Sequence, residues 1–312
     1  MIDKRLINKR KVYNKITAYG ITALSLTAVF MVLMIFVFLF KESSLFITSD
    51  LVKTEMRELG ITLYDLLGSE YQSVAYPPKI GLQPLITSTI RVTFVAILVA
   101  TPLSFLAAIY VSVFAPRWIK ELIKPVIELL AGIPTVVLGF FALMVLATWI
   151  QTITGSIYRL NALVGGVALS FTIIPIMFTL MEDAISSVPV PMKEASLALG
   201  ATPWQTAVKV LVPAAKSGVV AAFLLGASRA FGETMIALMA TGNAALNTFN
   251  IMLPARTMAA NIGQEMAEVA FGDFHYATLF LIGFILFIVT FIFNAIANLY
   301  VGHLVSKSLG KV

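Results

Sequence analysis

The chain has no cysteine, only two histidines and few charged residues. Of its 312 residues, 12% are Asp, Glu, Lys or Arg. Without cysteine there can be no disulfide, no thiolate nucleophile and no cysteine-based zinc site. His275 and His303 both fall near the ends of apolar segments, and neither has further ligands at the spacing of a metal site. We therefore expect them to be interfacial polar residues rather than metal ligands.

The sequence also lacks a phosphate-binding loop and a recognisable catalytic constellation. The Gly310-Lys311 pair is followed by Val312, so the pattern G-x-x-x-x-G-K-[ST] is absent. No nucleophile with a histidine base and no metal cluster is apparent. We therefore expect a non-enzymatic chain without a cofactor of its own, whose energy comes from another chain.

What the chain has in abundance is apolar sequence. Hydrophobic residues make up 59% of it, which is too many for a soluble globule of this length. A lipid-exposed span needs about 20 apolar residues in helical form, because hydrocarbon cannot satisfy an open backbone. The sequence predicts an all-α integral membrane protein with six transmembrane helices: Tyr19–Phe40, Leu85–Phe114, Val126–Ile150, Leu163–Met181, Ala214–Ala240 and Tyr276–Val301.

The first of these segments follows a basic N-terminus and could be mistaken for a cleaved signal. Its apolar run is too long for a signal peptide, and no A-x-A-like cleavage site follows before Lys41. We expect a retained anchor.

The basic residues indicate an orientation for the six spans. With both termini in the cytoplasm, the inner segments hold fourteen Lys and Arg residues and the outer segments hold six. This bias places the segment 182–213 in the cytoplasm. The formal charge of +6 therefore reflects topology, and no basic groove with interleaved aromatics suggests nucleic-acid binding.

The segment Glu194–Pro213 is a polar, basic loop between apolar spans. Lys193–Leu199 reads as a helix that stops at Gly200, the residue best able to adopt a left-handed conformation. Thr202 is a natural N-cap with Pro203 at the first helical position, and Pro213 ends or kinks the second helix. Two short helices joined by a tight turn predict a compact knob that fits a cleft on a soluble partner.

Two charged residues fall in the middle of the fifth span. Arg229 lies about 20 Å into the helix, too deep to reach water, and Glu233 follows four residues later on the same predicted face. Such residues line a bundle interior or an aqueous path. We favour a path for an anion over a purely structural ion pair. Gly218, Ala222 and Gly226 form a small-residue stripe where another helix can approach.

Other features within the spans are weaker signals. Arg91, two turns into the second span, is either an anchor that extends outward or a cation of the pathway, and Glu128 is expected to be an interfacial carboxylate. Three prolines interrupt spans two, three and four, where protein or water must cover the freed carbonyls: Pro102, Pro134 and Pro175.

The docking loop and three further stretches give the chain a specific resemblance. The loop follows the pattern E-A-A, three residues, Gly, nine residues, I-x-L-P, by which permeases of ATP-driven importers hold their ATPase. Here Glu194, Ala195 and Ser196 precede Gly200, and Val210-Leu211-Val212-Pro213 closes the pattern. With ELLAGIPTVVLGF (128–140), GASRAFGETMIALMATGN (226–243) and the 275–294 stretch, the chain resembles the PstC-type permease subunit of the bacterial phosphate-specific ABC importer over about residues 85–301.

The resemblance implies the permease fold of type I ABC importers in the cytoplasmic membrane. It also implies a second permease of PstA type, two copies of a cytoplasmic ATPase that bind ATP and Mg²⁺, and an extracytoplasmic phosphate-binding protein. One chain with one docking loop would supply half of a two-fold channel. We expect residues 1–84 to hold the anchor and first outer loop, 85–302 the permease core, and 303–312 a cytoplasmic tail.

The resemblance further assigns residue roles. The family's R-A-x-G-E-T motif maps onto Arg229, Glu233 and Thr234, which with Arg91 are the expected substrate-pathway residues. The expected ATPase-coupling residues are Glu194, Ala195, Ser196, Gly200 and Pro213. Ser196 departs from the family's second alanine, a small-for-small change.

Several alternatives remain open at this stage. The chain could carry another oxyanion such as sulfate or molybdate, or be the PstA-type subunit, since both subunit types share the loop and the Arg/Glu motif. A secondary transporter would share the spans and buried charges but gives no reason for a docking loop. A membrane enzyme is the least favoured class.

Overall fold

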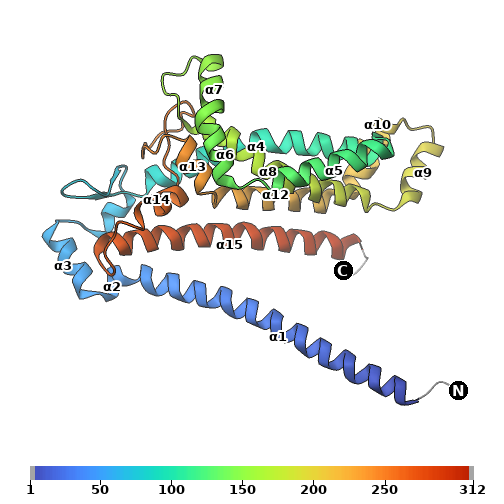
Figure 1. Cartoon of the computed structure of the whole chain (residues 1–312), viewed down its shortest axis with the longest axis horizontal. Helices are drawn as coiled ribbons and strands as arrows, with labels where there is room; N and C mark the ends of the chain where they lie inside the picture. Colours follow the sequence, from blue (N-terminus) through green and yellow to red (C-terminus); the bar gives the residue numbers. More distant parts are fainter. Residues whose placement is uncertain (1–3, 309–312) are drawn as a thin grey trace.

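The computed structural model describes residues 4–308 as a bundle of helices aligned with one long axis (Figure 1). This confirms the all-α prediction. The lengthwise helices are α1 (Lys4–Ser43), α4 (Gln83–Ile109), α5 (Arg117–Ala131), α8 (Ala162–Ser186), α12 (Lys216–Phe231) and α15 (Phe274–Ser308). Within the described range, five helices are long and apolar enough to cross a membrane, and six if one bent pair counts as a span.

The two ends of the bundle differ. One end, here called the α9 end, carries α9 (Val190–Ala198), α10 (Pro203–Thr206), the π-helical turn η4 (Ala207–Leu211) and α11 (Val212–Ala214). The first turns of α1 and the last turns of α15 lie toward this same end (Figure 1).

The opposite end, here called the α3 end, holds the shorter elements and a small core of its own. Phe46, Val52 and Met56 pack there with Phe274 of α15. The elements are α2 (Leu45–Thr48), α3 (Asp50–Glu58), η1 (Leu63–Leu67), the antiparallel strands β1 (Tyr71–Gln72) and β2 (Lys79–Ile80), α13 (Met235–Ala240) and α14 (Met258–Glu265).

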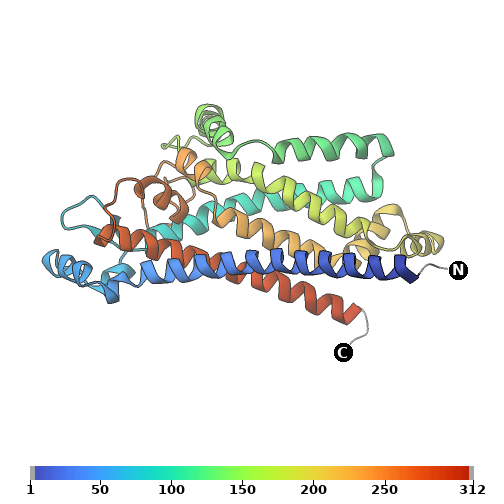
Figure 2. The ribbon, with the colours of Figure 1, turned by 60° about the horizontal axis from the view of Figure 1, so that its bottom comes forward.

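The third expected span, Val126–Ile150, is interrupted at Pro134, as the sequence predicts, and its two parts take different directions. α5 ends at Ala131 and the chain turns through Gly132–Pro134. It continues as α6 (Thr135–Phe141), a π-helical turn η3 (Ala142–Leu146) and α7 (Ala147–Thr154). α5 runs lengthwise, whereas α6 and α7 run across the bundle (Figure 1), and α7 is seen nearly end-on in Figure 2. The break follows from Pro134, which has no N–H and disfavours helical geometry at the preceding residue.

The other two prolines expected to interrupt spans do not break them. Pro102 lies inside α4 and Pro175 inside α8, and both helices are continuous. α4 instead changes to a π-helical turn, η2 (Tyr110–Phe114), at its α9 end.

The fifth expected span, Ala214–Ala240, is bent at one end and broken at the other. The helices before and after Ala215 meet at 73°, two residues after Pro213. α12 then ends at Phe231, and α13 starts only at Met235. Gly139 of α6 lies against α13, where an added Cβ would meet Met239 Sδ at 2.9 Å.

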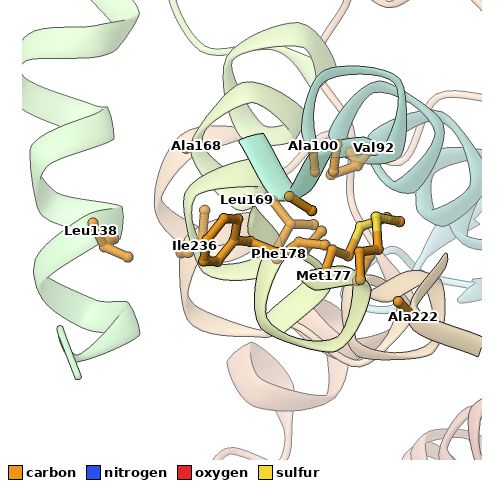
Figure 3. Packing of buried hydrophobic residues seen from close by; sticks show 14 of the residues in the cluster. Val92, Ala100, Leu138, Ala168, Leu169, Met177, Phe178, Ala222 and Ile236 are labelled. Carbon is orange, nitrogen blue, oxygen red and sulfur yellow. The ribbon is translucent and has the colours of Figure 1, made fainter. Parts of the chain in front are cut away.

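The centre of the bundle is built from small residues that let α8 approach its neighbours. A Cβ on Gly226 of α12 would lie 2.7 Å from Met177 Cγ of α8, and one on Gly218 would overlap Ala184. This confirms the predicted small-residue stripe. Met177 and Phe178 are fully buried between these helices (Figure 3). Because lipid is as apolar as a side chain, such close packing stabilises the bundle more than hydrophobicity does.

The N-terminal helix α1 stands apart from this centre. It contacts α15 through aromatic side chains near the α3 end, where the rings of Phe36 and Phe284 are 5.8 Å apart and those of Phe38 and Phe280 are 5.6 Å apart. Toward the α9 end the two helices diverge (Figure 1). The apolar window of α1 is 0% buried within the chain.

Candidate functional site

The α9 end carries a helical knob whose local geometry matches the sequence prediction. α9 ends before Gly200, which has a φ of +84°. The Thr202 hydroxyl accepts from the N–H of Gln205 at 3.2 Å, and the Gln205 side chain accepts from the N–H of Thr202 at 2.9 Å. This reciprocal cap starts α10 with Pro203 at its first position.

One contact joins the two helices of the knob, and a second holds the knob against the bundle. Ser196 and Thr206 share a hydroxyl hydrogen bond of 2.9 Å that ties α9 to the start of the second helix. The ring of Trp204 packs on Phe114 at the end of the π-helical turn η2, with centroids 6.3 Å apart. The departure from the family pattern at Ser196 thus supplies a hydrogen bond that alanine cannot make.

The outer face of the knob is unusually exposed for an apolar surface. α9 has no buried residue, and Glu194 and Ala195 face solvent. Leu199 is 90% exposed, and Val190 and Trp204 are more than half exposed. Exposed apolar side chains rimmed by charge are typical of a protein-binding surface.

The second candidate site is the break between α12 and α13. Arg229 occupies the last turn of α12 and is exposed, with no hydrogen bond or ion pair to any part of the chain between residues 4 and 308. Glu233 and Thr234 lie in the three-residue break and are half-buried. One oxygen of Glu233 accepts from the backbone N–H of Met235 at 3.2 Å.

The structure corrects the predicted shared face of these two residues. Because the helix ends at Phe231, Glu233 is not on the helical face of Arg229 four residues earlier. The glutamate caps α13 instead. Arg229 therefore presents its charge at this break without compensation from Glu233.

Arg91, the remaining predicted pathway residue, lies elsewhere and is enclosed. Its side chain does not extend outward to water, because the residue is only 2% exposed. The guanidinium donates to the backbone carbonyls of Asn250 at 2.5 Å and Pro254 at 3.1 Å, and to Ser88 Oγ at 3.2 Å. It thereby fixes the 241–257 segment on α4, while its Nε has no partner within the described chain.

Sequence reasoning missed a buried ion pair near the α9 end. Glu182 of α8 is 3% exposed, and one of its oxygens lies 2.6 Å from Lys124 Nζ of α5. Ser186 donates to the other oxygen at 2.8 Å. The pair joins two helices far apart in sequence, and only the carboxylate at the end of an apolar run could have drawn attention to it.

A second missed network is centred on Glu265 at the α3 end. Its carboxylate accepts from Tyr71 at 2.8 Å, Ser73 at 2.7 Å and Arg256 at 2.9 Å, and lies 2.8 Å from His275 Nε2. Burial alone raises the pKa of Glu265, but the hydrogen bonds from His275, Ser73 and Tyr71 outweigh it and hold the pKa below its ordinary value. Burial and the nearby Glu265 charge raise the pKa of Tyr71.

This network accounts for His275, which was expected to be an interfacial polar residue. Among residues 4–308, no group of three or more His, Cys, Asp or Glu side chains is arranged to hold a metal ion. The side chain of His303 lies outside the part that the structure describes.

Comparison with known proteins identifies the chain's relatives. Residues 100–307 match the family model of the binding-protein-dependent transport system inner membrane component. The chain is 39% identical over 216 residues to the "Probable ABC transporter permease protein YqgH" of Bacillus subtilis, covering 69% of this chain and 70% of that protein. It is 32% identical over 239 residues to the "Phosphate transport system permease protein PstC" of Mesorhizobium japonicum, covering 70% and 73%.

A solved structure gives the same fold. A bacterial ABC transporter involved in the import of the acidic polysaccharide alginate aligns with 94% of this chain and 99% of its own, with a TM-score of 0.57 and 13% identity. At this identity the likeness concerns the fold alone. The fold, the length of the family match and the two relatives agree. The chain therefore belongs to the binding-protein-dependent transport system inner membrane component family, the multi-pass inner-membrane permease subunits of ABC transporters.

Proposed function

We propose that this chain is the PstC-type permease through which an ABC importer moves inorganic phosphate into the cell. The observation that carries the proposal is Arg229, an exposed and uncompensated cation at the α12–α13 break, about 20 Å along α12 from Lys216. Similarity to curated PstC permeases at 32% identity supports phosphate as the substrate.

Family membership implies an ATPase and a substrate-binding protein as partners. The finer assembly belongs to the proposal: a second permease of PstA type, two copies of the ATPase that bind ATP and Mg²⁺, and a binding protein for phosphate outside. The residues Glu194, Ala195, Ser196, Gly200 and Pro213 would couple the knob to the ATPase. The apolar exposure of α9 supports this role.

The proposed orientation places the α9 end and both termini in the cytoplasm. The excess of Lys and Arg in the segments on that side supports it. The knob would then face the compartment that contains ATP, and the α3 end with its Glu265 network would face the binding protein.

The chemistry of the break suits a protonated oxyanion. A guanidinium offers forked donors to phosphate oxygens and offsets the loss of hydration in a low-dielectric passage. Phosphate at neutral pH still carries a proton that a carboxylate can accept. Glu233, with one oxygen still free of its backbone contact, would take that hydrogen bond and repel fully ionised sulfate. Thr234 at the same break adds a hydroxyl.

The proposal is tested by radiolabelled phosphate uptake in cells that express the complete importer. Arg229→Gln should abolish uptake while the ATPase still co-purifies, because the amide keeps donors but loses the charge. Arg117→Gln is the matched control, since that side chain is 93% exposed in the first turn of α5. The double variant Arg229→Gln with Glu233→Gln should stay inactive; near-normal uptake would contradict the role of Arg229 in the anion path. Competition by sulfate or molybdate as strong as by phosphate would assign a different oxyanion.

A further inference from the structure

Glu128 is a carboxylate at membrane depth with no partner in its own chain. It lies eleven residues after Arg117, which puts it about 17 Å along α5 from the α9 end. Lys124, one turn earlier, pairs with Glu182 of the apolar span α8, so Glu128 lies a further turn along that span. Over the range 4–308, its side chain makes no hydrogen bond and no ion pair, and it is exposed.

The two sides of α5 differ in what they contact. Ile123 and Ile127 pack against the central core, and Lys124 pairs with Glu182, so this side faces α8. Leu129 is 73% exposed on the other side. Figure 2 shows α5 along the edge of the bundle, with nothing of this chain beyond it.

An open cavity of about 600 Å³ lies on this outward side, where α5 breaks into α6. Pro125, Glu128, Leu129, Gly132, Ile133 and Pro134 line it. Apart from the one carboxylate, the lining side chains are apolar. Within the turn, the N–H groups of Gly132 and Ile133 donate to carbonyls of α5, and the Pro134 carbonyl accepts from α6. The carbonyls of Gly132 and Ile133 have no backbone partner among the described residues, and hydrocarbon could not supply one.

Lipid is a poor occupant for this cavity. Charged side chains within a membrane face the protein interior or a water-filled path and pair with other groups, because lipid does not compensate charge. The nearest cation on α5, Lys124, lies one turn before Glu128 and is engaged by Glu182 at 2.6 Å, so it is not paired with Glu128. Charge complementarity therefore calls for a cationic side chain supplied from outside the chain.

We infer that the second permease chain binds at the α5–α6 break and inserts a cationic side chain beside Glu128. A permease of the same fold is the partner that shares this depth of the membrane; the soluble ATPase and binding protein do not reach it. The inference rests on the proposed pairing of two permease chains. The α5–α6 break then serves the subunit interface rather than the membrane surface.

Photo-crosslinking tests the location directly. Leu129, in the same cavity, is replaced by p-benzoylphenylalanine, which leaves Glu128 in place, and membranes that contain the complete importer are irradiated. We expect a covalent adduct with the second permease chain, identified by its tag and by mass spectrometry. Adducts with lipid alone would overturn the inference.

A charge change tests the pairing. Glu128→Lys should lower the amount of second permease that co-purifies by at least about tenfold, because like charges repel at an interface. Glu121→Lys is the matched control, with the same change seven residues earlier on α5, where the carboxylate is 65% exposed and paired with Arg117 at 2.9 Å. Co-purification of Glu128→Lys at wild-type yield would contradict the inference.

The outcomes separate this inference from the function on which it rests. If no second permease chain is present in the purified wild-type importer, both fail. If one is present but the crosslinker that replaces Leu129 forms no adduct with it, only the inference fails. If Glu128→Lys prevents membrane insertion, the crosslink, made with the native glutamate, decides the result.

Discussion

At the scale of single residues, the charged residues within the predicted spans were easier to find than to pair. Arg229 and Glu233 stand out in sequence because they interrupt an apolar span, but their four-residue spacing implied a shared helical face. The helix ends between them, so the pairing could not be predicted. Arg91 was found for the same reason, yet its partners are carbonyls from a segment about 160 residues later.

Polar residues at the ends of spans were missed altogether. Glu182 and Glu265 look like ordinary interfacial residues in the sequence, and their partners come from other elements. Whether such a carboxylate is solvated or enclosed depends on tertiary packing. Sequence periodicity does not record this packing.

The Glu265 network should make the α3 end sensitive to acid. Since the folded-state pKa of Glu265 is below its ordinary value of 4.5, the ionised carboxylate contributes stability above that pH, and the contribution is lost as the pH falls through the folded pKa. His275, Arg256 and Tyr71 all face this carboxylate. We predict that Glu265→Gln costs about 2 kcal/mol at pH 7 and much less below pH 4.5.

The measurement is the thermal unfolding of the purified importer between pH 7 and pH 4, with amide exchange to localise the change to β1, β2 and α14. Glu268→Gln, an exposed glutamate three residues away, is the control and should have no effect. A difference between wild type and Glu265→Gln that grows as the pH falls would contradict the assignment.

At the scale of elements, short-range rules predicted the knob well. The end of α9, the left-handed Gly200, the Thr202 cap and the Pro203 start depend on interactions within a few residues. The π-helical turn between α10 and Pro213 was not foreseen. The interruption of the third span by Pro134 was predicted but its change of direction was not, and the fifth span was predicted as continuous, because hydropathy records length and not direction. Their breaks lie at Gly132–Pro134 and at Gly232–Thr234.

Gly200 gives a prediction at this scale. Its φ of +84° strains any β-branched residue by about 1–3 kcal/mol, although the space around it is open. Gly200→Val should therefore distort the turn between α9 and α10 and reduce the retained ATPase by roughly tenfold. Membrane insertion should be unchanged.

The matched control is Gly155→Val. Gly155 has a φ of +66° and the same open surroundings, but it follows α7, away from the knob. Pull-down of the ATPase from detergent-solubilised membranes is the readout. Equal loss in both variants, or wild-type yield with Gly200→Val, would refute the coupling role of this turn.

At the scale of the whole molecule, the distribution of Lys and Arg supports the proposed orientation, with the α9 end inside. Ser69 lies in the loop between η1 and β1 at the α3 end, and Ser187 follows α8 at the α9 end; both are exposed. In this cysteine-free chain, single cysteines at Ser69 and Ser187 should be labelled by an impermeant thiol reagent from outside and inside, respectively. Labelling of both from the same side would exclude the proposed topology.

Several surfaces and charges of the molecule have no partner within the part of the chain that the structure describes. α1 has a largely unpacked surface, α6 and α7 extend across the bundle, and Glu128 and Arg229 have no partners between residues 4 and 308. Composition alone predicted a membrane protein with several spans. It could not indicate which faces meet lipid and which meet another chain, since both are apolar.

Uptake into proteoliposomes tests the central claim most directly. The purified importer is reconstituted with its binding protein outside, and radiolabelled phosphate in the lumen is measured with ATP or a non-hydrolysable analogue enclosed. We predict accumulation against the gradient with ATP only, and its loss in Arg229→Gln vesicles that retain the ATPase. Uptake that proceeds equally with the analogue, or that survives the loss of Arg229, would contradict an ATP-driven phosphate path through this chain.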